Sequence, residues 1–341
     1  MARRPTLSQA RQIEALLKAQ TPLIRAAFEA AIANAHRSLD FTGLVAAIEQ
    51  NDLGRVFDLL RINQAALFPL DEAIRVAFIA GGTSVIAPRG IVGGFGFNGR
   101  HPVAERIIAE TGARLVSEIG SPGPEVIRTI LLRGQVQGTG ADRVARQLAG
   151  TINRITGIRE GGILGLDGPR ALRAENVRAI LSDPARIAEY FKADGTPRYT
   201  STGRNFDAMV RRAIKEGRAL PSADLERVAR AHEARLLKAR GNAIAQNEAF
   251  TAQARGRNEA YRQMLDNPDV ESITKRWQHS SLQHPRLDHM RLDQVTVNFD
   301  DAFPPMDDGA ILAYPHDPAG GPQHSISCRC TVVYQPKFRK D

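Results

Sequence analysis

The last part of the chain decides how the rest is interpreted, and residues 277–334 read WQHSSLQHPRLDHMRLDQVTVNFDDAFPPMDDGAILAYPHDPAGGPQHSISCRCTVVY. This stretch holds the only tryptophan of the chain, both of its cysteines and five of its eight histidines. Short apolar segments alternate here with proline, glycine and aspartate, a pattern typical of short strands joined by turns. We therefore expect a small α+β module that follows a long helical body.

Length and composition limit the class of protein. The 341-residue chain is long enough for two or three folding units, and its hydrophobic fraction of 43% is ordinary for a globular protein. The net charge of +9 comes mostly from arginine, which favours a polyanionic partner, although a solvated basic surface gives the same charge. No signal peptide is recognised, and no apolar run approaches the ~18 residues that a membrane span needs. We expect a protein that is made in a cytoplasm and stays soluble.

Apolar residues recur at helical spacing through most of the chain before residue 268. Residues 1–82 are predicted to form a variable helical bundle, and residues 83–100 a glycine-rich linker. Gly94–Gly99 matches the dinucleotide fingerprint G-x-G-x-x-G, but no second strand follows, so we interpret it as a loop between helical units. Residues 101–268 should form a central helical region and residues 269–341 the C-terminal module. The predicted fold class is mainly α, with multi-helix N-terminal and central regions and a small α+β C-terminal module.

The longest predicted helix begins at Pro221 and runs to about Leu265, with an apolar stripe on one face and a strongly basic opposite face. A shorter amphipathic segment around residues 206–214 is also basic on its wet side. Such faces can bind nucleic acid or an acidic protein surface, or can simply be solvated. The candidate contact residues are Arg211, Arg212, Lys215, Arg227, Arg230, Arg235, Lys238 and Arg240.

A second feature bears on nucleic acid. Residues 141–152 resemble the first helix and turn of a helix-turn-helix, which in a basic protein suggests that duplex DNA is read. The second helix would have to pass Gly157, Gly161 and Gly162, which suit a recognition helix poorly. We therefore favour ordinary helical packing here and keep duplex reading as the alternative.

The chain also carries a series of motifs in a fixed order. The first lies in residues 206–248 and reads F-D-x2-V-x2-A-I-x-E-G-R-x-L, then R-L-L-x-A-R, then A-Q-N-E. The second consists of Trp277, Arg286-x2-His289, Pro315-x-Asp317-Pro318 and Cys328-Arg329-Cys330. Together they resemble the phage Mu F-like head morphogenesis (minor head, or minor capsid) proteins, and residues from about Phe97 onward follow that family's order.

The resemblance implies a structural or assembly protein of the virion, present in several copies per particle. Its implied partners are the portal protein, other head proteins and packaged DNA, which it contacts without reading sequence. Its implied place is the head interior or the portal vertex, and the host cytoplasm during assembly. Head assembly, DNA packaging or DNA delivery is the expected task, and no defined enzymatic activity is implied.

The same resemblance makes His289 the imidazole of a His/Cys cluster. Thiolates together with imidazole favour Zn²⁺, and alternation along a predicted strand puts the sulfurs of Cys328 and Cys330 on one side. A structural zinc would stabilise a module of ~60 residues that has few large apolar groups. The predicted ligands are His289, Cys328, Cys330 and His284, with His316 or Asp317 as alternatives for the fourth position.

Other readings of these residues stay open. The cysteines can be small buried apolar residues, with His289 hydrogen-bonded nearby and no cofactor bound. A metal-dependent hydrolase would need an open coordination position and a general base such as Asp288 or Asp317. A Cys–His nucleophile would need a lowered thiol pKa. The alternative functions are thus a helix-turn-helix regulator or a hydrolase in the C-terminal module, and we expect no enzyme.

Overall fold

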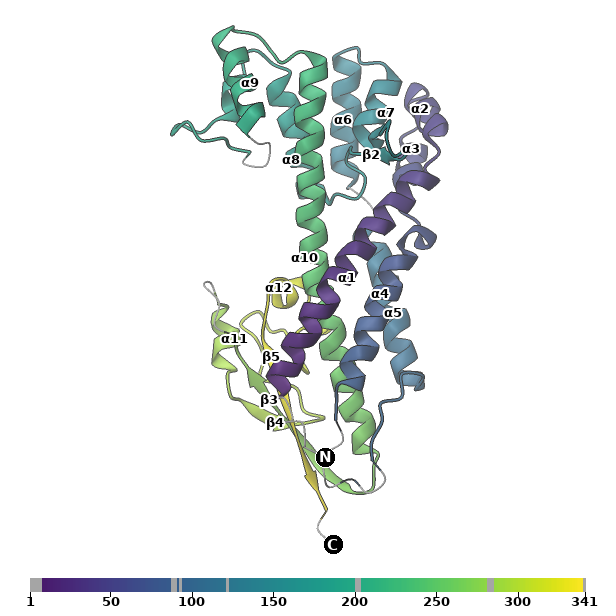
Figure 1. Cartoon of the computed structure of the whole chain (residues 1–341), viewed down its shortest axis with the longest axis vertical. Helices are drawn as coiled ribbons and strands as arrows, with labels where there is room; N and C mark the ends of the chain where they lie inside the picture. Colours follow the sequence, from purple (N-terminus) through teal and green to yellow (C-terminus); the bar gives the residue numbers. More distant parts are fainter. Residues whose placement is uncertain are drawn as a thin grey trace. The chain divides into compact units, whose positions relative to one another are not determined.

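The protein is mainly α-helical, as the sequence predicts, with 61% of the chain in helices and small sheets made of few short strands. The computed structural model describes residues 8–86, 91, 94–120, 123–199, 204–280 and 285–339. Figure 1 shows long helices and, near the C-terminus, the strands of a small sheet. The expected α+β character of the C-terminal region is confirmed.

The chain divides into two compact units, each assembled from separate stretches of sequence. The first unit contains Met1–Phe28, Pro69–Ala113 and Asn242–Asp341, and the second contains Glu29–Phe68 and Arg114–Gly241. The expected domains were contiguous ranges with boundaries at residues 82, 100 and 268. The observed units differ because four helices contribute residues to both of them: α1 (Gln9–Ser38), α4 (Gln64–Thr83), α5 (Pro102–Ile119) and α10 (Ser222–Leu265).

The second unit is a helical assembly. Its further helices are α2 (Phe41–Glu49), α3 (Leu53–Leu60), α6 (Pro124–Val136), α7 (Ala141–Ala149), α8 (Gly168–Leu181), η1 (Ile187–Tyr190) and α9 (Arg204–Lys215). Three aspartates cap α2, α3 and α8, since the carboxylates of Asp40, Asp52 and Asp167 each accept a backbone N–H from the first turn. Apolar faces of α2, α3, α6, α7 and α8 meet in one core.

The helix-turn-helix interpretation is wrong. The first helix exists as α7, but Gly150 ends it with a positive φ of 77°, and a two-stranded antiparallel hairpin follows. The hairpin pairs β1 (Thr151–Ile152) with β2 (Arg159–Glu160). A Cβ at position 150 would lie 2.1 Å from the carbonyl oxygen of Glu160, so only glycine fits this turn. Residues 150–167, all of which the structure describes, contain no helix that could serve as a recognition helix after α7.

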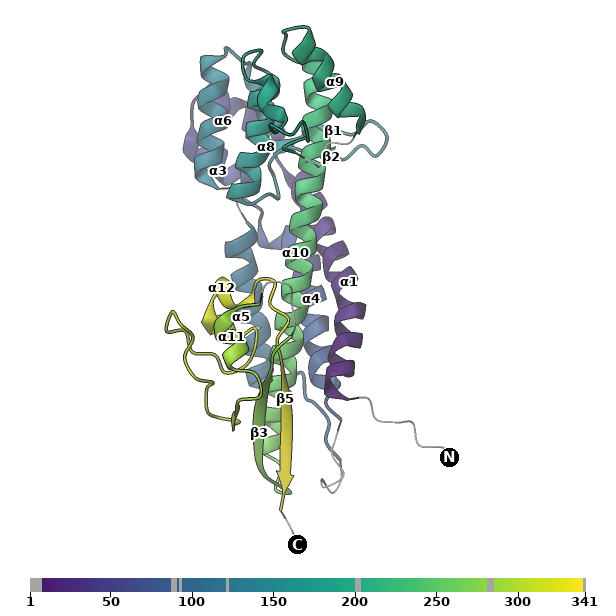
Figure 2. The ribbon, with the colours of Figure 1, turned by 90° about the vertical axis from the view of Figure 1, so that its left-hand side faces the viewer.

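The first unit places a small sheet beside helices. Strand β3 (Val270–Gln278) lies between β4 (Thr296–Asn298) and β5 (Thr331–Phe338), and both pairings are antiparallel. Figure 2 shows β3 and β5 side by side along their length. The aromatic residues Trp277, Phe299, Phe303 and Tyr314 are buried together in the core of this unit.

The outer edge of β5 is protected from pairing with another strand. The side chain of Gln9 in α1 donates to the carbonyl of Tyr334 at 2.8 Å and accepts the N–H of Tyr334 at 3.3 Å, so it replaces a neighbouring strand at that position. Pro336 has no N–H to offer two residues further on. Both features remove free hydrogen-bonding groups from an edge strand.

Close helix packing in this unit depends on glycine. A Cβ on Gly256 of α10 would lie 2.1 Å from the carbonyl oxygen of Phe78 in α4, and one on Gly81 would lie 2.8 Å from Cα of Gln253. The backbones of α4 and α10 are therefore in direct contact. The described part of the expected glycine-rich linker packs here too, because Phe95 and Phe97 are partly buried against the core.

Candidate metal centre

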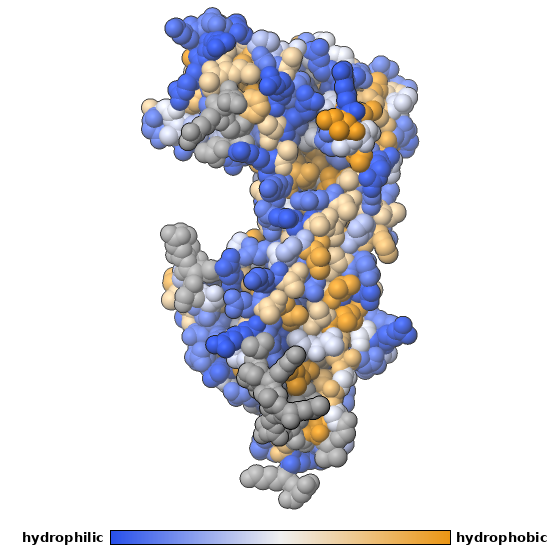
Figure 3. All heavy atoms as spheres, in the orientation of Figure 1, coloured by the Kyte–Doolittle hydropathy of each residue, from blue (hydrophilic) through white to orange (hydrophobic). Residues whose placement is uncertain are grey.

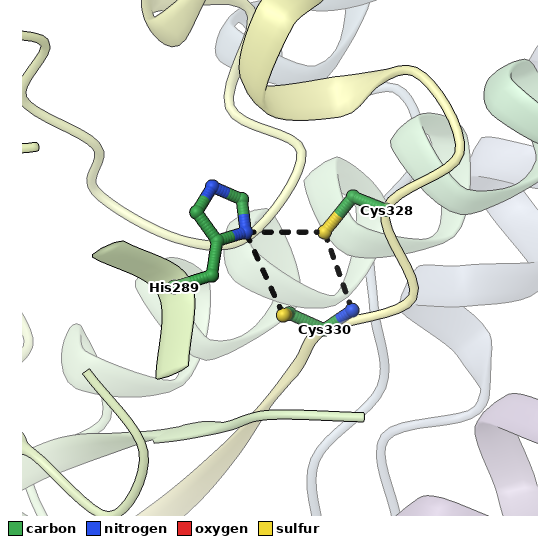
Figure 4. Close-up of side chains that lie close together, drawn as sticks. All are labelled: His289, Cys328 and Cys330. Atoms are coloured by element: carbon green, nitrogen blue, oxygen red, sulfur yellow. Dashed lines mark hydrogen bonds between the residues drawn. The ribbon is translucent and has the colours of Figure 1, made fainter. Parts of the chain in front are cut away.

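Two elements bring the candidate ligands together. His289 lies in the short helix α11 (Leu287–Arg291), and Cys328 and Cys330 lie in the extended segment that enters β5. Figure 4 shows the imidazole ring directed at both sulfur atoms. The prediction that both sulfurs face one side is confirmed, although these two residues precede the strand and do not belong to it.

The local backbone explains this placement. Helix α12 (Pro322–Ser325) ends just before the cysteines, and Ser327 has a left-handed φ of 58° that turns the chain toward β5. The N–H of Cys328 then donates to the carbonyl of Ser325 at 3.1 Å. The N–H of Cys330 donates to Sγ of Cys328 at 3.3 Å, which holds the first sulfur in place.

The separations fit a zinc ion. Nδ1 of His289 lies 3.5 Å from Sγ of Cys328 and 3.7 Å from Sγ of Cys330. With Zn–S near 2.3 Å and Zn–N near 2.1 Å, tetrahedral geometry requires an N···S separation of about 3.6 Å. The three residues are 1%, 3% and 4% exposed, so the group is closed to solvent. This buried group can hold a metal ion.

The two thiols constrain each other's ionisation. The hydrogen bond between them raises the pKa of Cys328 and lowers the pKa of Cys330, while burial raises both. A second hydrogen bond, to His289, adds to the lowering at Cys330. Two adjacent buried thiolates repel each other, so one thiolate is the preferred state of the pair without a cation. A bound dication would remove that repulsion, because both thiolates would then be ligands.

A chain of hydrogen-bonding groups continues behind His289. Its Nε2 lies 3.1 Å from Nδ1 of His324, and Nε2 of His324 lies 3.1 Å from both carboxylate oxygens of Asp308. The two imidazole rings stack at 17°. An ionised Asp308 makes His324 donate from Nε2, which leaves Nδ1 of His324 to accept from Nε2 of His289. The lone pair of His289 is then on Nδ1 and faces the sulfurs, as a metal ligand requires.

Asp308 is suited to this role. Its carboxylate accepts the N–H of Ala310 and hydrogen bonds from His324 and Gln323, and these lower its pKa to about 2. It is therefore ionised at neutral pH. Sequence reasoning missed both His324 and Asp308, because neither stands at a recognisable spacing from the cysteines; the only signal was the density of histidine in this stretch.

A second group of potential ligands shares His289. Oδ2 of Asp288 lies 3.8 Å from Nδ1 of His324, and these two residues form the second group together with His289. In this second group, Nε2 of His289 is not free to bind a metal, because it is hydrogen-bonded to Nδ1 of His324 at 3.1 Å. The sulfur side, at Nδ1, is therefore the candidate metal position, and the Asp288 side lies behind it.

Three residues are predicted candidates for the fourth ligand, and the structure places each of them differently. His284 lies outside the described residues. Asp317 is used elsewhere, because its carboxylate accepts backbone N–H groups of Ala313 and Ala319. His316 is 1% exposed, stacks on Phe250, and neither ring nitrogen has a hydrogen-bond partner among the described residues. Burial lowers its pKa to about 3, but His316 belongs to neither ligand group that the described residues form.

Most of the candidate basic contact residues are exposed. Hydrophilic residues gather over the region of α9 and the first turns of α10 in Figure 3. Several make local contacts: Arg211 stacks on Phe191 and Arg227 pairs with Asp224. The exposed residues are Arg211, Arg212, Lys215, Arg227, Arg230, Arg235 and Lys238.

Arg240 is the exception, and its assignment to an exposed basic face is wrong. It is 4% exposed and donates to the carbonyl of Gly165 at 2.6 Å, with the carboxylate of Asp167 at 3.8 Å. Burial lowers its pKa to about 10. These partners lie more than 70 residues away in the sequence, so helical periodicity alone did not reveal them.

Comparison with protein-family models, with curated proteins and with solved structures finds no match to this chain. None of the described helices is both long enough and apolar enough to cross a membrane.

Proposed function

We propose that this chain is a structural protein of a phage head, and that its C-terminal module is held together by a zinc ion. The observation that carries the proposal is the closed group of His289, Cys328 and Cys330, whose separations suit tetrahedral zinc. These residues belong to the series of motifs that carries the resemblance to phage Mu F-like minor head proteins. The same series includes Trp277, whose ring packs edge-on against His289 at 5.5 Å.

The role of the metal is structural. Zinc would be held by one imidazole and two thiolates, with a fourth ligand outside this set. When bound, it would join α11 to the segment that enters β5. A catalytic zinc needs a coordination position open to substrate, whereas all three ligands are at most 4% exposed. Burial therefore favours a structural site over the hydrolase alternative.

Contact with packaged DNA is the second element of the proposal. The exposed cations of α9 and α10, from Arg211 to Lys238, are suited to phosphate contacts that carry no sequence information. Binding through them should weaken steeply with salt and vary little between duplex sequences. The proposed partners are the portal protein, other head proteins and packaged DNA, and the proposed location is the head interior or portal vertex.

Two experiments test the proposal. Mass spectrometry and electron microscopy of purified particles should find the chain in the head, in several copies; its absence from assembled particles would refute the virion role. Cobalt(II) added to the metal-free full chain should give thiolate-to-metal charge-transfer absorption and intense tetrahedral d–d bands. Loss of these bands in Cys330→Ser, but not in His279→Ala, would assign them to the sulfur site.

A further inference from the structure

A cavity of about 580 Å³ lies within the second unit. Residues of α6, α7, α8 and the beginning of α10 form its walls. Its size is within the range of sites that hold small molecules or parts of larger ones. Its lining is dominated by charged and hydrogen-bonding side chains, with five arginines and three carboxylates. The arginines are Arg133, Arg143, Arg146, Arg178 and Arg230.

Each arginine at the floor of the cavity is already paired with carboxylates. Arg178 is 6% exposed and pairs with Glu226 and with Glu233, each at 2.7 Å. Arg133 pairs with the buried carboxylate of Glu175. These pairs use the floor arginines fully and fix their positions, so the floor offers rigid walls and no free positive charge.

The rim carries the excess positive charge. Arg230 donates to the carbonyl of Glu226 at 3.2 Å and to the hydroxyl of Thr151 at 3.1 Å, both neutral oxygens. Arg143 has no carboxylate partner among the described residues, and Arg146 pairs with Asp142 at 2.8 Å. Three arginines against one carboxylate leave two positive charges at the rim.

We propose that this rim binds a phosphate group. Guanidinium groups bind phosphate oxygens through paired, charge-assisted hydrogen bonds, and at this rim Arg143 and Arg230 have no carboxylate partner among the described residues. The hydroxyls of Thr151 and Ser222 also line the cavity and can donate to further oxygens. Free oligophosphates and the backbone of a nucleic acid share this chemistry. The inference deepens the DNA contact proposed above, because Arg230 belongs to both.

The test uses the full chain and two pairs of substitutions. Arg143→Gln with Arg230→Gln removes two rim charges, and Arg212→Gln with Lys215→Gln removes two exposed charges from α9, away from the cavity lining. Circular dichroism confirms that both variants fold. Pyrophosphate binding is measured by titration calorimetry, and binding of a short random duplex by fluorescence anisotropy, at fixed salt.

We expect the rim pair to weaken binding of at least one ligand about tenfold or more, and the α9 pair to have a much smaller effect on it. If the rim pair weakens the binding of both pyrophosphate and the duplex, the site binds the nucleic-acid backbone. If the rim pair weakens the binding of pyrophosphate alone, the site binds a free oligophosphate. The effect of the α9 pair on duplex binding then tests the proposed DNA contact independently. If the rim pair weakens the binding of neither ligand more than the α9 pair does, the inference is wrong.

Discussion

Replacing His324 with phenylalanine tests how the residues behind the metal position support it. The phenyl ring keeps the volume and the stacking on His289, which is 5.3 Å between ring centres, but it cannot accept a hydrogen bond. Nε2 of His289 then loses its partner at 3.1 Å in a site that is 1% exposed. Loss of such support typically costs 10- to 100-fold in metal affinity, or about 1.4–2.7 kcal/mol.

The assay is competition for zinc with a chromophoric chelator at pH 7.5. Asp308→Asn should lower the affinity less, by about tenfold, because its carboxylate is half-exposed and one acceptor oxygen remains. The matched control is Asp307→Asn, which removes a neighbouring carboxylate that pairs with Arg291 on the surface. We expect the control to bind zinc as the wild type does. If His324→Phe stays within twofold of the wild type, the hydrogen-bonded chain does not support the ligand.

Three further predictions concern stability and are checked by urea unfolding. Gly256→Ala should destabilise the first unit by about 2–3 kcal/mol, because its Cβ would meet the carbonyl oxygen of Phe78 at 2.1 Å; an unchanged midpoint would contradict the close contact. Glu233→Gln should destabilise the second unit by about 1.5–3 kcal/mol, since it removes one of the two charged partners of the buried Arg178 and leaves Glu226; a loss below about 0.5 kcal/mol would count against that pairing. Burial lowers the pKa of His36 to about 4, so His36 is protonated at a higher pH in the unfolded chain than in the folded one. The free energy of unfolding should therefore fall as the pH decreases from 6.5 to 4, by up to ~1.4 kcal/mol per pH unit. His36→Gln should flatten that slope, and an unaltered slope would show that other groups cause it.

Local patterns in the sequence predicted the elements well. The apolar stripe and the Pro221-Ser222 start gave a helix to about Leu265, and α10 covers Ser222–Leu265. The alternation of Cys328 and Cys330 predicted two sulfurs on one side, which the short distances to His289 confirm. These features depend on residues close together in the sequence, so periodicity and residue type are sufficient to find them.

Contacts between distant residues were not predictable in the same way. Arg240 belongs to the basic face by its spacing, yet a loop about 75 residues earlier buries it. His324 and Asp308 meet because the chain folds back between α11 and α12, and no spacing rule relates them to His289. The two discontinuous units were not predictable for the same reason. Long helices contribute residues to both units, and the local composition does not change at the residues where one unit ends and the other begins.

Zinc content is the most direct test of the metal centre. The full chain is purified without added metal or chelator, its zinc is quantified by elemental analysis, and the emission of Trp277 reports whether the module is folded. We predict about one equivalent of zinc, lost in His289→Ala and retained in His279→Ala. Less than about a tenth of an equivalent in a chain whose tryptophan is still buried would show that the cysteines are only small core residues.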